Sequence, residues 1–164
     1  MAKEHWKAEP DGHDYPAAAD YLSLLLTAPQ VDLVVTSLRA AALIHHKAKD
    51  LLRAAGLPLL DAKDPDVVRD MREVRRGRRL SPVLLVRGAV DHGIPLTVAD
   101  GYHRICASYH INEDTEIPCR LADLSAPPEL ALRPGSPTDP PKPARRGNRA
   151  GQTRMDPATT VTQG

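Results

Sequence analysis

The sequence predicts one small α+β domain, and three observations support that prediction. The chain has 164 residues, of which 41% are apolar, and this suffices for one modest core but not for two. Segments with apolar residues at helical spacing are interrupted by short runs rich in Val, Leu and Ile, which are typical of buried strands. From residue 125 onward Pro, Gly, Thr and Arg dominate, and the sparse apolar residues predict a disordered tail.

Two helices are expected near the N-terminus. The first covers residues 16–26, where a proline stands at a favourable first helical position and Ala28-Pro29 forms the stop. The second begins at a cap formed by Thr36 or Ser37, continues with apolar residues at helical spacing to residue 52, and is closed by Gly56.

A third helix has the best-marked ends in the chain. Asp64 is expected to cap it, Pro65 suits its first position, and Gly77 closes it. Two buried strands follow at residues 82–86 and 96–99.

After these strands come a short helix over residues 102–111 and a last strand over residues 116–121. Pro118 lies in this last strand and has no backbone N–H to donate, so we expect the strand at a sheet edge or a bulge.

Composition and charge limit the partners that the chain can have. Twenty-two basic residues against twenty-one acidic ones leave a net charge of +1, so only a local patch could attract a polyanion. No apolar run approaches the roughly 20 residues that cross a bilayer, which predicts no membrane partner. The polar, proline-broken start lacks the apolar core of a signal peptide, and Cys106 and Cys119 are expected to be buried thiols, so a cytoplasmic location is predicted.

The candidate site is the turn between the strand at residues 96–99 and the helix that follows. A helix N-terminus has unpaired backbone N–H groups and the positive end of the helix dipole, so it attracts phosphate. Gly101 lacks a Cβ that would hinder close approach, and His103 and Arg104 follow in the first turn. Arg104 offers several donors to phosphate oxygens, and Asp100 either caps the helix or faces a metal ion or a hydroxyl group. An ordinary capped strand-to-helix turn is the alternative reading of the same residues.

An ordered series of motifs between about residues 58 and 123 resembles the ParB/sulfiredoxin-like superfamily. It comprises a capped helix ending in Gly, the strand LSPVLLVRG, the segment VADGYHRICASYH with G-x-x-R at a helix start, and the strand TEIPCRLAD. In ParB-like proteins this G-x-x-R segment holds nucleotide phosphates. The resemblance therefore implies that Gly101, Tyr102, His103 and Arg104 bind ATP or CTP, with Mg²⁺ as an expected bridging ion.

The resemblance also leaves an enzymatic alternative. Sulfiredoxins carry their catalytic Cys at the position that Tyr102 occupies here, so that activity is not expected. Some ParB-like proteins phosphorylate a small hydroxyl compound with an acid near the phosphate site as base. By resemblance, Asp100 would be the catalytic residue of a small-molecule kinase or nucleotide hydrolase.

Four arginines around Gly77 form a second candidate site. Arg75, Arg76, Arg78 and Arg79 stand at the expected helix C-terminus, where cations face the negative end of the dipole. That placement alone explains them, but they could also contact a phosphate or bind DNA without sequence specificity. No residues are assigned as metal ligands, because His103, Cys106 and Cys119 lack a fourth partner and a zinc-site spacing.

The sequence thus predicts three regions and one principal activity. Residues 1–56 form an N-terminal helical segment, residues 57–124 a ParB/sulfiredoxin-like domain with a short mixed sheet and flanking helices, and residues 125–164 a disordered Pro/Arg-rich tail. The expected function is nucleotide binding.

Overall fold

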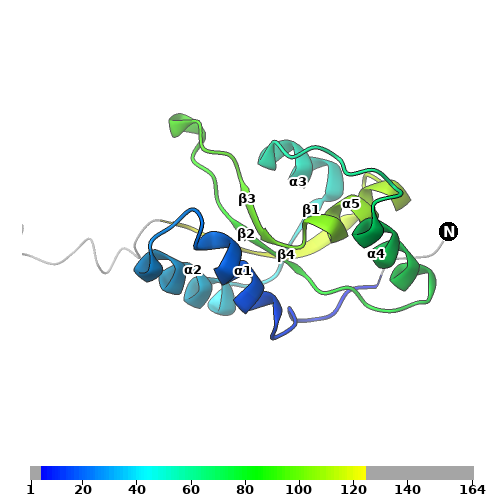
Figure 1. Cartoon of the computed structure of the whole chain (residues 1–164), viewed down its shortest axis with the longest axis horizontal. Coiled ribbons are helices and arrows are strands. Elements are labelled where there is room, and N and C mark those ends of the chain that lie inside the picture. The colour runs from blue at the N-terminus through cyan, green and yellow to red at the C-terminus, as the bar shows by residue number, and fades with distance from the viewer. Residues whose placement is uncertain (1–4, 125–164) are drawn as a thin grey trace, which may run out of the picture.

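The computed structural model describes residues 5–124, and four strands in them form one mixed sheet (Figure 1). The strands are β1 (Ile44–Lys47), β2 (Val83–Val86), β3 (Thr97–Asp100) and β4 (Glu116–Ala122), arranged in the order β1-β4-β2-β3. β2 and β4 are parallel, whereas the two outer pairs, β1 with β4 and β2 with β3, are antiparallel. The predicted α+β class with a short mixed sheet is confirmed.

Helices cover both faces of this sheet. α1 (Asp14–Leu22) and α2 (Ala28–Ala40) pack on one face, and α3 (Ala48–Ala55), α4 (Pro65–Arg75) and α5 (Tyr102–Ile111) pack on the other (Figure 1). Successive residues of β2 alternate between two cores: Val83 and Leu85 contact the α3–α5 layer, while Leu84 and Val86 contact the α1–α2 layer. Because β2 is buried on both faces, its sequence is uniformly apolar.

The prediction for the N-terminal segment was wrong in two places. Ala28-Pro29 does not end a helix but begins α2, because Thr27 forms a capping box with Gln30 and proline suits the first helical turn. Thr36 and Ser37 consequently lie inside α2. The expected second helix is interrupted by β1, whose residues pair with β4, and only its last part forms α3.

The prediction for the remaining described chain was largely correct. α4 is capped by Asp64 and begins at Pro65, and α5 has the predicted bounds. Gly56 and Gly77 adopt the left-handed conformation expected of helix-terminating glycines. A short 3-10 helix, η1 (Val90–His92), lies in the hairpin between β2 and β3.

The edge position expected for the strand containing Pro118 was wrong. β4 lies between β1 and β2, because the N-terminal segment supplies an additional strand. Pro118 is tolerated there because it faces His45 of β1, whereas the ladder with β2 begins one residue later at Cys119.

Two further expectations concern the ends of the chain and the membrane. The predicted disordered tail, residues 125–164, lies outside the described residues. Among residues 5–124 no helix has the length and apolar character that spanning a bilayer requires.

Candidate functional site

The predicted strand-to-helix turn is present between β3 and α5. β3 ends at Asp100, Gly101 has a left-handed φ of 109°, and α5 begins at Tyr102. No side chain caps the N-terminus of α5. The first N–H groups of an α-helix have no partner within the helix, so those of α5 depend on water or a ligand.

Gly101 has a role in the packing of the fold itself. A Cβ added at this position would lie 2.9 Å from the Cβ of Val83 and 3.0 Å from an Arg104 guanidinium nitrogen. The missing side chain therefore makes room for β2 and for Arg104. Together with the positive φ, this packing explains the glycine without reference to a ligand.

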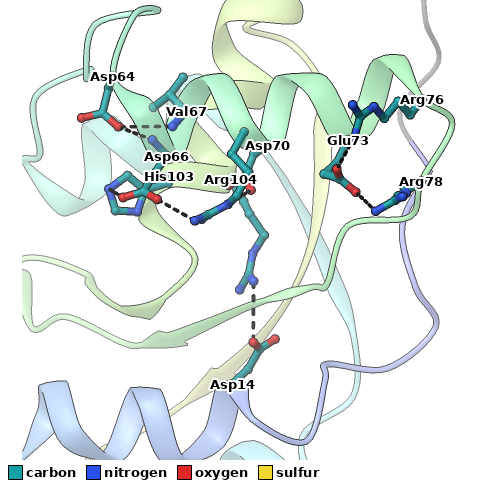
Figure 2. Close-up of polar contacts among 11 residues, drawn as sticks. Asp14, Asp64, Asp66, Val67, Asp70, Glu73, Arg76, Arg78, His103 and Arg104 are labelled. Carbon is teal, nitrogen blue, oxygen red and sulfur yellow. Dashed lines mark hydrogen bonds and ion pairs between the residues drawn. The ribbon is translucent and has the colours of Figure 1, made fainter.

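Arg104 belongs to an ion-pair cluster beside the start of its own helix. One guanidinium nitrogen donates to Asp100 Oδ2 at 2.5 Å, and the other lies 3.7 Å from Asp14 Oδ1. The Arg104 side chain is only 15% exposed, and Figure 2 shows it extending from α5 toward Asp14. Arg104 thus pairs with two carboxylates of the protein and fixes the position of Asp100.

Asp14 is a member of this cluster that the sequence did not predict. It is buried at the start of α1 and accepts a hydrogen bond from the Ser81 hydroxyl. Burial raises the pKa of the Asp100 carboxyl above its ordinary value of 3.8, Arg104 opposes that shift, and Asp14 adds to it. The local pattern around Asp14 is that of a helix start, so only the packing of α1 against β3 reveals its role.

A cavity of about 440 Å³ opens beside the turn. Asp100, Gly101, Tyr102 and His103 form one wall, and Ala17, Tyr21, Leu57, Val98 and Ala99 form the others. The Tyr102 hydroxyl donates to the carbonyl oxygen of Pro58 at 2.5 Å, which fixes its ring at the rim. The structure therefore brings four of the five residues of the predicted loop to one cavity, and Arg104, the fifth, does not line it.

His103 also lies beside two carboxylates of α4. Each of Asp64, Asp66 and His103 offers one potential ligand atom, and these three atoms lie within 4.8 Å of one another. Figure 2 shows the three side chains side by side. Asp64 is already the helix cap and accepts from the N–H groups of Asp66 and Val67 at 3.0 and 3.2 Å. Asp66 is paired with Arg69 at 2.6 Å. Carboxylates suit Mg²⁺, but the sequence placed an expected Mg²⁺ near Asp100, which is not part of this group.

The arginine cluster lies at the opposite end of α4 from His103, as Figure 2 shows for Arg76 and Arg78. These two side chains pair with Glu73, at 3.6 and 2.9 Å respectively. Arg75, Arg76, Arg78 and Arg79 are all exposed. The fold does not bring these four arginines beside Arg104, so they do not extend the cavity site.

The two cysteines are free and buried, as predicted. Burial raises the pKa of the Cys106 thiol, and it raises that of Cys119 to about 12. A thiol held in its neutral form is a poor nucleophile. The cysteines therefore act as small apolar residues of the core around α5 and β4.

Comparison of the chain with models of known families, with curated proteins and with solved structures yields no match.

Proposed function

We propose that the cavity beside the β3–α5 turn binds the phosphate groups of a nucleotide, ATP or CTP. The observation that carries this proposal is that the predicted phosphate loop, Asp100 to His103, forms one wall of a cavity of about 440 Å³. The resemblance to ParB-like domains supports the same ligand class.

The donors in this proposal differ from those that the resemblance implies. The uncapped first-turn N–H groups of α5 and the imidazole of His103 contact the phosphates. Arg104 serves as a positioning residue, because its guanidinium is bound to Asp100 and faces Asp14. The Asp64, Asp66 and His103 group would hold a Mg²⁺ that accompanies the nucleotide, with waters completing its coordination.

A panel of ATP, CTP, GTP, UTP and pyrophosphate, each with and without MgCl₂, tests the proposal by thermal unfolding. A ligand present at ten times its Kd adds about 1.4 kcal/mol to the free energy of unfolding. For a domain of this size that stabilisation raises Tm by roughly 4–8 °C. We expect ATP or CTP to produce such a shift.

His103→Ala is expected to abolish the shift, since it removes a cavity side chain that is not part of the core. His92→Ala is the matched control, because His92 is exposed in η1 and does not line the cavity. No Tm shift with any phosphate compound, or an equal loss of the shift in both variants, would refute the proposal.

The alternative function is phosphoryl transfer or nucleotide hydrolysis with Asp100 as the base. One observation favours this function: Asp100 lines the cavity, and the pKa of its carboxyl is raised. A carboxylate with a raised pKa is a better general base near neutral pH than one with an ordinary pKa. Asp100→Asn retains an oxygen for Arg104 but removes the base. Release of phosphate by wild type but not by this variant would establish the enzyme, and equal release in both would exclude Asp100 as its base.

DNA association and location are separate proposals. Exposed arginines at 75, 76, 78 and 79 would contact phosphate backbones without reading sequence, and such binding weakens steeply with salt. Affinity for DNA that is independent of salt would contradict this mode. The two free thiols support a reducing, cytoplasmic location.

A further inference from the structure

A second cavity, of about 540 Å³, lies next to the candidate site, and we call it the apolar groove. Its lining includes Tyr21, Leu22, Leu25, Leu26, Ile94 and Leu124. Three of its lining residues, Tyr21, Leu57 and Val98, are shared with the cavity beside the β3–α5 turn. The apolar groove and the candidate site are therefore neighbours.

Four of the seven exposed large apolar residues of the described chain line the apolar groove. Leu25 is 57% exposed and Ile94 is 53% exposed, and Tyr21 and Leu124 are also exposed. Contiguous apolar surface of this kind marks a place where something binds. The structure also identifies where a candidate occupant begins, since Leu124 is the last described residue and lines the groove.

We propose that residues 127–132 of the same chain, PPELAL, occupy the apolar groove. Leu130 and Leu132 are the last two leucines of the sequence, and no Leu or Ile follows them. Leu130 and Leu132 thus follow shortly after Leu124 at the rim of the apolar groove, and in residues 133–164 the only larger apolar side chains besides proline are Met155 and Val161.

The geometry of the chain permits this docking. Residues 125–132 span at most roughly 26–29 Å when extended, at about 3.3–3.6 Å per residue, so Leu130 and Leu132 are tethered close to Leu124 at the rim. In an extended conformation Leu130 and Leu132 point to the same side, which lets both face the groove. A segment tethered at the rim also has an effective concentration in the millimolar range, so weak contacts suffice to hold it.

An ion pair lies at the rim of the apolar groove, close to the end of the described chain. Arg87 lines the apolar groove, and its guanidinium is paired with Asp123 at 2.5 Å, one residue before Leu124. This pair lies at the point where the described chain leaves the groove.

Methyl NMR on the full-length protein tests the proposal. The sequence has five isoleucines, and Ile94 lies in the groove, whereas Ile105 and Ile117 are fully buried elsewhere. Leu130→Glu combined with Leu132→Glu should displace the segment and move the Ile94 methyl resonance, while those of Ile105 and Ile117 stay in place. Thr159→Glu with Thr160→Glu adds the same charge far along the tail and should leave all of them unchanged.

A hydrophobic dye gives a second readout on the same proteins. The Leu130/Leu132 variant should increase dye fluorescence several-fold by exposing the groove, and adding Leu25→Glu should reverse that increase, because Leu25 belongs to the groove itself. An Ile94 resonance identical in wild type and the Leu130/Leu132 variant would overturn the proposal. A resonance that depends on protein concentration would overturn it too, because a second copy would then be the occupant.

Discussion

Gly101 is the residue on which the geometry of the candidate site depends. Its left-handed φ of 109° turns the chain from β3 into α5, and its missing side chain leaves room for Val83 of β2. The absence of a Cβ at Gly101 also lets the Arg104 guanidinium approach the backbone, and from there the guanidinium donates to the Asp100 carboxylate. A single residue thus sets both the direction of the α5 N-terminus and the position of the acid beside the cavity.

Replacing Gly101 by alanine should destabilise the protein by about 2–5 kcal/mol. A positive φ costs a residue with a side chain about 1–2 kcal/mol, and overpacking against Val83 adds about 1–3 kcal/mol. Gly93→Ala is the matched control, because Gly93 also has a positive φ but no atom within 4 Å of an added Cβ. Urea unfolding of both variants measures the difference, and equal losses of stability would show that the Val83 contact is unimportant.

Asp70 of α4 should make stability depend on pH. Its side chain is 12% exposed, and burial raises the pKa of its carboxyl above the ordinary 3.8 despite nearby Arg69 and Arg104. The folded state therefore binds this proton more tightly than the unfolded state does, and the resulting stabilisation is complete below pH 3.8 and lost as pH rises through the folded pKa.

The variant Asp70→Asn cannot lose that proton. We therefore expect the free energy of unfolding of Asp70→Asn to increase relative to that of wild type as pH rises from 3.5 to 7. The variant becomes the relatively more stable protein at high pH. Urea unfolding of both proteins across this range measures the trend. A difference that stays constant with pH would show that the Asp70 carboxyl has the same pKa in both states.

At the level of elements, local capping signals predicted the structure best. Asp64-Pro65 and Gly56 mark helix ends through their own backbone preferences, so their neighbours in space are not needed. Pro29 is ambiguous in this respect, because proline both follows helices and begins them. β1 was missed because its residues, IHHK, show no apolar alternation, and pairing with β4 alone makes them a strand.

The candidate site could be predicted only in part for the same reason. The β3–α5 turn is local, and the sequence placed it correctly. Asp14, which lies beside Arg104, comes from a helix far away in sequence, and Asp64 and Asp66 meet His103 only through the packing of α4 on α5. These residues carry no local signal of a site.

At the level of the whole molecule, the N-terminal segment and the predicted ParB/sulfiredoxin-like domain share one sheet and two cores. β1 covers an edge of β4, and α1 and α2 bury Leu84, Val86 and Ala122. Arg120 of β4 links the two regions further: its guanidinium donates to the Tyr15 hydroxyl at 3.0 Å, to the Arg39 carbonyl oxygen at 2.7 Å and to Glu9. Without residues 1–56 this guanidinium would be exposed on a bare sheet face.

Residues 57–124 alone should therefore fail to fold, whereas residues 1–124 should unfold cooperatively. The fragment would present an unpaired β4 edge and an entire uncovered apolar face, and it would lack the Asp14 carboxylate that lies beside Arg104. Circular dichroism and thermal unfolding of the two proteins measure this. A cooperative transition in the fragment, with Tm within about 5 °C of that of residues 1–124, would show that the N-terminal segment is an accessory to an independent domain. Addition of residues 1–56 in trans provides the positive control, because pairing of β1 with β4 and packing of α1 on β3 should restore structure at high concentration.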